Sequence, residues 1–267
     1  MNFNNYQIYK NQIIIDEGNM TLTLAIHSSK GGTGKTSIAL NLAVAFALEG
    51  KDTCLIDLDL RGPSLSSIFE TKTHFWINDF LSGKCSLKDT MNDFQKDIGT
   101  DGHIYVSFAN PDIKAIRELV SKDRNWQAGA LKALMNGKKE LAENNMDIII
   151  FDTSPGVEYE SINAVAASDM VIIVHNDTNA CSNCTEQLIK GVYTLLDKKC
   201  AIVDNMHHGN CLDIIEKKRY GAPILATIPC MCEIATRSAN EILVRSDPEH
   251  LFSKSITAIK DKIIEMQ

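Results

Sequence analysis

The 267-residue sequence has no apolar run close to the roughly 18 residues that a membrane-spanning helix needs. Residues 1–19 are polar and contain no apolar core of a secretion signal. Internal repeats, low-complexity tracts and linker-like segments are also missing. We therefore expect a cytoplasmic protein, in which an N-terminal extension over residues 1–19 precedes a single domain over residues 20–267.

Positive charge is scarce as well. The chain has 27 Lys and Arg against 34 Asp and Glu, which gives a formal net charge of −7. This balance argues against a broad surface for nonspecific nucleic-acid binding, so nucleic acid is not an expected partner. The local exception is Lys217–Arg219, which is either a basic patch or the solvent-exposed end of a helix.

The most informative segment runs from Ser28 to Thr36 and reads Ser-Ser-Lys-Gly-Gly-Thr-Gly-Lys-Thr. A β-prone stretch, 22–26, precedes it, and a helical pattern, 37–48, follows it. Strand, glycine-rich turn and helix are the setting of a phosphate-binding loop, whose backbone N–H groups surround anionic oxygens. The side chain of Lys35 would reach the β- and γ-phosphates, and the hydroxyl of Thr36 would bind Mg²⁺. The residues expected to contact the nucleotide are Gly31, Gly32, Thr33, Gly34, Lys35, Thr36 and Ser37.

Aspartates stand at the ends of two apolar runs. Asp57 and Asp59 end the run 53–59, and Asp152 follows the run 147–151. The order strand, helix, strand predicts a parallel pair, and the carboxyl ends of parallel strands meet at one edge of a sheet. The runs that end in these aspartates resemble the switch I and Walker B elements of P-loop ATPases, which implies that Asp152 holds Mg²⁺ through a coordinated water and that Asp57 supports the metal's surroundings.

The stretch Lys-Gly-Gly-Thr-Gly-Lys-Thr, residues 30–36, resembles the deviant Walker A loop of the MinD/ParA/Mrp group of P-loop ATPases. The generic pattern has a glycine where this chain has Ser29. In that group a signature lysine reaches across a nucleotide-sandwich dimer. The resemblance assigns this role to Lys30, as a catalytic residue beside Lys35.

Further segments extend the resemblance. Residues 57–65 resemble switch I of the group, which implies that Asp59 polarises the attacking water. Residues 152–156 resemble the Walker B and switch II element, which implies that the N–H of Gly156 contacts the γ-phosphate. Asn205 ends a predicted strand where family members read the adenine edge, and an amide suits that task because it both donates and accepts hydrogen bonds.

The resemblance covers roughly residues 22–262 and implies a three-layer α/β fold, with a doubly wound, mostly parallel sheet between helices. It implies an ATP- and Mg²⁺-dependent molecular switch that forms an ATP-sandwich homodimer, acts in intracellular positioning or partitioning, and has a protein activator. One alternative is a metal or iron–sulfur carrier, similar to Mrp-type scaffolds and carbon-monoxide-dehydrogenase maturation ATPases. Another is a nucleotide-binding regulator without hydrolysis.

Eight cysteines in a cytosolic chain are not expected to form disulfides. Cys181 and Cys184 form a C-x-x-C pair, and Cys230 and Cys232 form a C-x-C pair, each after a predicted strand. Four thiolates could bind Zn²⁺ or an iron–sulfur cluster, in one chain or across a dimer. The alternative is four structural thiols, because the pairs do not fall where the Mrp-type pair is expected. We expect His207–His208 to lie in a solvent-facing loop.

The remaining periodicity predicts the other elements. We expect an edge strand at 13–15, and a helix at 251–266 that either packs on the sheet or touches a membrane surface. The other expected elements are a short helical insert within 77–89, strands at 103–111, 170–174, 201–205 and 222–229, one or two helices within 116–141, and a helix at 179–197.

Overall fold

A computed structural model describes residues 21–69, 73–176, 178–208, 217–238 and 241–267. The expected N-terminal extension and the strand expected at 13–15 lie outside these ranges. The described strands form one sheet in the order β3-β4-β2-β5-β1-β6-β7-β9-β8, and all neighbours are parallel except β3–β4 and β8–β9. The strands are β1 (Leu22–His27), β2 (Thr53–Leu58), β3 (Met91–Asp93), β4 (Ile104–Ser107), β5 (Ile148–Thr153), β6 (Met170–His175), β7 (Lys199–His207), β8 (Lys218–Arg219) and β9 (Ala222–Pro229).

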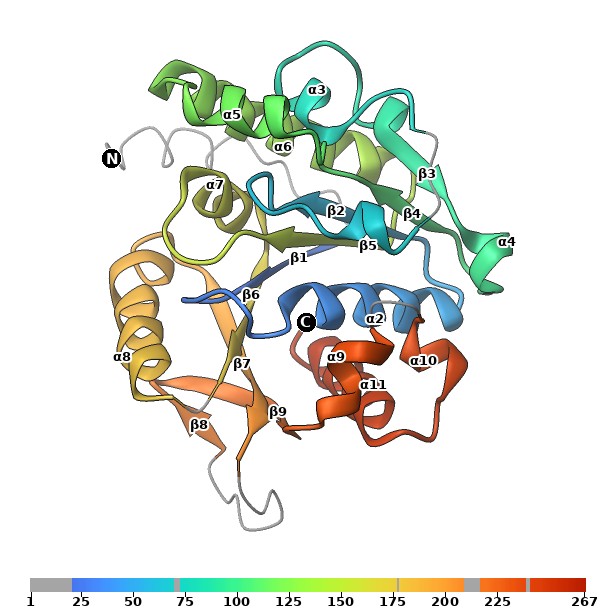
Figure 1. The fold of residues 1–267 in the computed structure, drawn as a ribbon, viewed down its shortest axis with the longest axis vertical. Helices are drawn as coiled ribbons and strands as arrows, with labels where there is room; N and C mark the ends of the chain where they lie inside the picture. The colour runs from blue at the N-terminus through green and yellow to red at the C-terminus, as the bar shows by residue number, and fades with distance from the viewer. Residues whose placement is uncertain (1–20, 70–72, 177, 209–216, 239–240) are drawn as a thin grey trace.

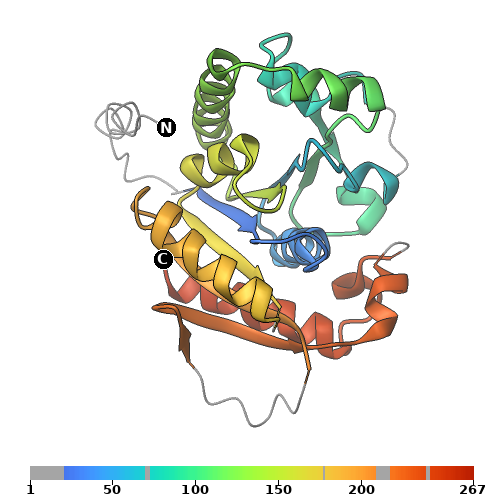
Figure 2. The ribbon, with the colours of Figure 1, turned by 60° about the vertical axis from the view of Figure 1, so that its left-hand side comes forward.

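Helices cover both faces of the sheet (Figure 1). On one face α2 packs with α10 and α11, and on the other α7 packs with α6, which also contacts α3. Figure 2 shows α8 and α11 on opposite sides of the strands. This three-layer arrangement confirms the predicted fold class. The helices are α2 (Lys35–Leu48), α3 (Ile77–Leu81), α4 (Gln95–Ile98), α5 (Ile113–Val120), α6 (Arg124–Glu143), α7 (Tyr159–Ala167), α8 (Asn179–Leu188), α9 (Cys232–Arg237), α10 (Leu243–Ser246) and α11 (Leu251–Glu265).

Strand β5 shows why the central strands are apolar along their whole length. Ile148 and Ile150 pack into the core on the α2 side, whereas Ile149 and Phe151 pack into the core on the α7 side. Successive side chains of a strand point to opposite faces, so a strand covered on both sides needs apolar residues at every position. The same reasoning applies to β1, which is paired with β5, and to β6, the next strand of the sheet.

The helix expected over 179–197 is shorter than predicted. Helix α8 ends at Leu188, and a π-helical turn, Ile189–Tyr193, follows it. Gly191 lies inside that turn, and glycine is among the weakest helix formers. The backbone N–H and the hydroxyl of Thr194 both donate to the carbonyl of Ile189 and close the turn. Tyr193, the last residue of this turn, is completely buried, and its hydroxyl contacts His27 in the site described below.

The expectation of an exposed helix end at Lys217–Arg219 is wrong. Lys218 and Arg219 form β8, which pairs antiparallel with β9. The two connecting residues, Tyr220 and Gly221, have φ angles of 53° and 84°. Positive φ at both central residues is typical of the tight turns that join two antiparallel strands, so this turn makes the segment a hairpin.

The C-terminal helix packs on the sheet, which confirms the first of the two alternatives that the sequence left open for it. Phe252, Ile256, Ile259 and Ile263 of α11 are buried against α2 and β9. Because these residues are the apolar stripe of the helix, the stripe is not available to a membrane surface. Within the described ranges, no helix is both long enough and apolar enough to cross a bilayer.

Candidate nucleotide-binding site

The order β2-β5-β1 places the predicted chemical residues at one edge of the sheet. Asp57 in β2 lies directly beside Asp152 in β5, and Asp152 in turn pairs with Ile26 near the end of β1. The glycine-rich segment follows β1 and leads into α2, which begins at Lys35. Open α/β sheets bind their ligands at this carboxyl edge.

Glycine at position 34 is required by its surroundings. Gly34 has a φ of 89°, and a Cβ there would lie 2.5 Å from Nδ2 of Asn205. That amide nitrogen donates to the carbonyl of Thr33 at 2.8 Å, so the end of β7 is fastened to the loop. The predicted adenine-reading residue therefore lies beside the phosphate-binding loop, and its amide oxygen is not used in that contact. The first N–H groups of α2 complete an anion-binding helix end.

Opposite charges are buried together at the start of α2. Lys35 is 6% exposed, and burial lowers its pKa, although the charges of Asp152 and Asp59 act in the opposite direction. Burial raises the pKa of Asp152 to about 7, and the charge of Asp59 adds to this effect, whereas the Thr36 hydroxyl and the Lys35 charge lower it. Burial and the neighbouring Asp152 charge raise the pKa of Asp57 well above its usual range.

The carboxylates are suited to a cation. Both carboxylate oxygens of Asp152 and the Oδ2 of Asp57 are buried without a partner in hydrogen-bond geometry in the described structure, although the Thr36 hydroxyl is near enough to Asp152 to lower its pKa. Leaving such oxygens unpaired is costly, and hard oxygen donors are the ligands that Mg²⁺ prefers. The described residues contain no group of three or more His, Cys, Asp or Glu side chains that could hold a metal ion. A magnesium ion here would therefore depend on the Thr36 hydroxyl, phosphate oxygens and water as well.

Two segments at this edge are linked in a way that the sequence does not reveal. The hydroxyl of Ser154 donates to Oδ1 of Asp59 at 2.9 Å, and Arg61 forms an ion pair with Glu158. The N–H of Gly156 donates to the carbonyl of Ser28 at 2.8 Å, so its predicted contact with a γ-phosphate would require a change of partner.

His27 is the last residue of β1, directly before the phosphate-binding loop, and was not among the predicted site residues. Its Nδ1 is 2.5 Å from the hydroxyl of Tyr193, which comes from the π-helical turn after α8. Both side chains are completely buried. Burial, and then the charge of Lys35, lower the pKa of His27 to about 3. The sequence signal was a histidine at the end of a buried strand, where an unpaired imidazole would be costly.

The two cysteine pairs have different environments. Cys181 is fully buried, and its Sγ is 3.3 Å from the hydroxyl of Ser29 in the phosphate-binding loop. Cys184 is half-buried, whereas Cys230 and Cys232 are exposed. These four thiols do not form a metal-binding group within the described part of one chain. A site made by one chain alone is therefore not supported, and the dimer-spanning site stays a hypothesis.

The expectation of a solvent-facing loop is wrong for His207. This residue ends β7, is largely buried, and has its Nδ1 3.5 Å from Oδ2 of Asp204. Asp204 is also 3.0 Å from Nδ1 of His175 and 3.3 Å from the guanidinium of Arg219. Its burial acts to raise its pKa, but the hydrogen bond from His175 and the charge of Arg219 outweigh this and leave the pKa below its usual value. The cluster anchors the strand that carries Asn205.

A hydrogen-bonded chain of Ser182, His175 and Asp204 has the connectivity of a hydrolase triad, with Nε2 of His175 3.3 Å from the Ser182 hydroxyl. Arg219 changes its chemistry. The guanidinium lies 3.2 Å from Nδ1 of His175 and also pairs with Asp204. The guanidinium therefore competes with the imidazole for Asp204, so this carboxylate is not dedicated to orienting the histidine as a triad requires. We interpret the chain as structural.

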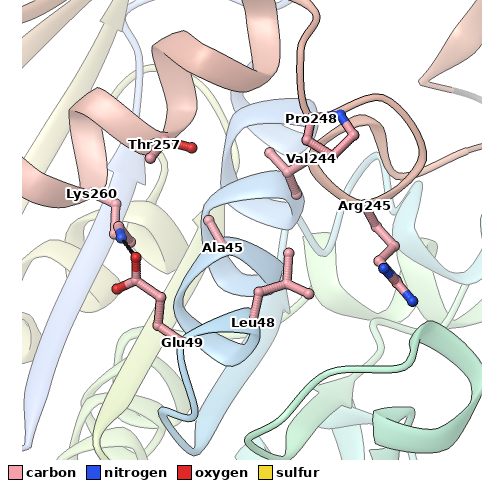
Figure 3. A pocket seen from close by; sticks show the side chains of 8 residues that line it. All are labelled: Ala45, Leu48, Glu49, Val244, Arg245, Pro248, Thr257 and Lys260. Carbon is pink, nitrogen blue, oxygen red and sulfur yellow. Dashed lines mark hydrogen bonds and ion pairs between the residues drawn. The ribbon is translucent and has the colours of Figure 1, made fainter.

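A hollow of about 280 Å³ lies away from these residues, at the other end of α2 (Figure 3). Lys260, although 2% exposed, forms an ion pair there with Glu49. Arg245 lies on the opposite side of the hollow from Lys260, and its guanidinium donates to the carbonyl of Ile98. Because the charged groups are already paired, the hollow shows no site for a ligand. It is lined by Ala45, Leu48, Glu49, Val244, Arg245, Pro248, Thr257 and Lys260.

Comparisons with known proteins agree with this geometry. The family model described as an AAA domain matches residues 21–206. An uncharacterised ATP-binding protein of Methanocaldococcus jannaschii is 30% identical over 158 residues, which cover 59% of this chain and 53% of that protein. The septum site-determining protein MinD of Bacillus subtilis is 29% identical over 153 residues, 57% of this chain and 52% of that protein. The chain thus spans about half the length of these relatives.

A longer match is the iron–sulfur cluster carrier protein of Pyrococcus abyssi, which is 26% identical over 237 residues, 82% of this chain and 77% of that protein. Among solved structures, the cell division ATPase MinD of Pyrococcus furiosus has a TM-score of 0.75 at 22% identity and covers 93% of this chain and 100% of that chain. MinD of Pyrococcus horikoshii, solved with Mg-ADP, has a TM-score of 0.73 at 21% identity and covers 92% of this chain and 97% of that chain. The chain therefore belongs to the AAA-domain family, within its MinD/ParA type of P-loop ATPases.

Proposed function

We propose that this protein binds and hydrolyses ATP and acts as an ATP-dependent dimerisation switch in positioning or partitioning inside the cell. The observation that carries the proposal is the buried group of Lys35, Asp57 and Asp152 at the start of α2. Its unpaired carboxylate oxygens and buried ammonium are matched to a cation and a polyphosphate. The relatives named as MinD and the Mg-ADP complex of the Pyrococcus horikoshii MinD support the same ligand.

In this proposal each residue of the site has its own role. The loop 31–34 and the first N–H groups of α2 hold the phosphates, and Lys35 neutralises their charge. Thr36, Asp57 and Asp152 would hold Mg²⁺, which when bound supplies charge stabilisation on the phosphate oxygens. Asp59 orients the attacking water. Since the transfer reaction needs little covalent help from the protein, positioning and charge account for most of the rate.

Lys30 and a second copy of the chain complete the site in this proposal. Lys30 is exposed, as a residue that reaches a facing subunit must be. Beside Gly156, Val157 is 67% exposed and Tyr159 is 41% exposed. Exposed apolar side chains next to a phosphate-sensing loop suit a contact that forms when the loop is ordered. Loss of the γ-phosphate would then release Gly156 and loosen the dimer. From the resemblance to the MinD/ParA group we also expect slow turnover until a protein activator binds.

The test begins with labelled ATP, Mg²⁺ and a phosphate-release assay on the full chain. We expect Lys35→Ala to abolish nucleotide binding, and Lys30→Ala to abolish ATP-dependent dimerisation in light scattering while some nucleotide binding remains. Lys84→Ala, which removes a surface ion pair with Asp79, is the matched control. Absence of ATP uptake by the wild-type chain would refute the proposal. Binding without phosphate release would instead favour the nucleotide-binding regulator.

A second candidate function is delivery of a metal or an iron–sulfur cluster. It is favoured by the match to the iron–sulfur cluster carrier protein, which extends over 82% of this chain. Cys230 and Cys232 are exposed and could combine with the same pair of a second copy. Metal analysis of anaerobically purified protein distinguishes the two functions. Stoichiometric iron or zinc that is lost in a Cys230→Ser, Cys232→Ser double variant supports the carrier, and metal-free protein with full ATPase activity excludes it.

A further inference from the structure

Arg61 connects two segments that the proposed reaction uses separately. It lies two residues after Asp59, and its guanidinium is 2.8 Å from a carboxylate oxygen of Glu158 and 3.6 Å from one of Glu160. Both glutamates follow Gly156, at the start of α7. Glu160 is 7% exposed, so Arg61 supplies positive charge to a carboxylate that is otherwise buried.

A second link joins the same two segments through Asp59, two residues before Arg61. The Ser154 hydroxyl donates to Oδ1 of Asp59 at 2.9 Å, and the N–H of Gly62 donates to the same oxygen at 3.1 Å. Asp59 is thus held by the turn that contains Arg61 and by the segment that contains Glu158. A displacement of residues 154–160 therefore acts on Asp59 both through its carboxylate and through its backbone turn.

The energetics of the ion pair suit coupling better than stability. The side chain of Arg61 is 38% exposed and that of Glu158 is 43% exposed. Half-exposed ion pairs contribute little to folding and weaken with salt. Arginine, with several N–H donors in a planar group, can contact two carboxylates at once, as it does here.

We propose that Arg61 is a positioning residue for ATP hydrolysis, which couples the segment 57–62 to the segment 154–160 through Glu158 and Glu160. Asp59 then reaches its place beside the water only when the segment around Gly156 engages the γ-phosphate. This inference rests on the proposed ATPase function. It predicts that Arg61 contributes to kcat and contributes little to the affinity for ATP.

The experiment compares wild type, Arg61→Ala, Arg61→Lys, Glu158→Gln and the Arg61→Ala, Glu158→Gln double variant. We expect kcat to fall about tenfold in Arg61→Ala, within the range known for coupled sites, while Kd for a nonhydrolysable ATP analogue changes less than about twofold. The double variant should lose no more than Arg61→Ala alone, because the pair acts as a unit. Arg61→Lys should recover part of the rate.

Two further readouts separate coupling from a general structural defect. Raising the salt concentration should lower kcat of the wild type and leave kcat of Arg61→Ala unchanged, since only the wild type has the pair to screen. The thermal midpoint of Arg61→Lys, which keeps a charge beside Glu160, should match that of Lys84→Ala, which loses a surface pair with Asp79. Arg61→Ala should have a lower midpoint, because Glu160 then stays buried without its cation. Unchanged kcat in Arg61→Ala, or additive losses in the double variant, would overturn the inference alone. A wild-type chain that does not hydrolyse ATP would overturn the proposed function and this inference together.

Discussion

The hydroxyl of Tyr193 lies 2.5 Å from Nδ1 of His27, so the π-helical turn after α8 reaches the end of the central strand β1. We predict that Tyr193→Phe destabilises the protein by about 1–3 kcal/mol, because the variant leaves a buried imidazole nitrogen without its partner. Urea unfolding measures the change. Tyr105→Phe, at a half-buried residue stacked on His103, is the control and should cost less than about 0.5 kcal/mol. Equal effects of the two substitutions would contradict the interpretation.

His27 should also make stability depend on pH. Its pKa is about 3 in the folded protein, against an ordinary value of 6.5. The unfolded chain therefore binds more protons between these values, so the contribution of His27 is complete above pH 6.5 and is lost as the pH falls toward 3. Each pH unit in this window removes about 1.4 kcal/mol. Asp152 has the opposite effect. Because burial raises its pKa to about 7 in the folded protein, its contribution to stability is lost as the pH rises from about 4 to 7.

The two effects are separated by comparing wild type with His27→Asn in urea at pH 7.5, 6.5 and 5.5. We expect the advantage of wild type over the variant to shrink by about 1 kcal/mol between pH 6.5 and 5.5. A constant difference across this range would show that His27 is not the group that titrates.

Gly34 and Gly83 have similar backbone conformations, so alanine substitutions at the two positions form a matched pair that tests the site. Gly34→Ala places a Cβ 2.5 Å from the amide of Asn205, whereas a Cβ at Gly83 has nothing within 4 Å. Both have positive φ, 89° and 72°, so both variants pay a backbone cost of about 1–2 kcal/mol. Only Gly34→Ala should also displace the strand end that carries Asn205. We expect at least a tenfold loss of ATP affinity, a difference of about 1.4 kcal/mol, in Gly34→Ala alone, measured by calorimetry.

The buried cluster around Asp204 should be a large contributor to stability. Asp204→Ala removes the shared partner of His175, His207 and Arg219, and we predict a loss of about 3–5 kcal/mol because buried charge is left uncompensated. Guanidinium chloride unfolding measures this loss. Glu186→Ala removes the exposed partner of Lys190 on α8 and should cost about 0.5 kcal/mol or less. A loss for Asp204→Ala as small as that of the control would show that the cluster is not held by charge.

Much of the central sheet could be predicted from local patterns. The strands around Ile26, Leu55 and Ile150 are short apolar runs that alternate with helical periods, and this order indicates a parallel sheet. The helix over 179–197 was predicted too long, because periodicity does not register the π-helical turn at Gly191. The strand at Lys218 was missed because its partner strand follows a two-residue turn with no Asn-Gly or Asp-Gly signal.

The sequence by itself determined the family, the fold class and the loop around Lys35, because a phosphate-binding loop is a contiguous motif between a strand and a helix. Only the tertiary structure decided which distant groups meet there. Asn205 is 172 positions from Thr33, and Tyr193 is 166 positions from His27. Arg61 and Glu158 likewise come from separate strand ends. These partners meet because parallel strands from distant parts of the chain end at one edge of the sheet, and no local pattern records which strands are neighbours.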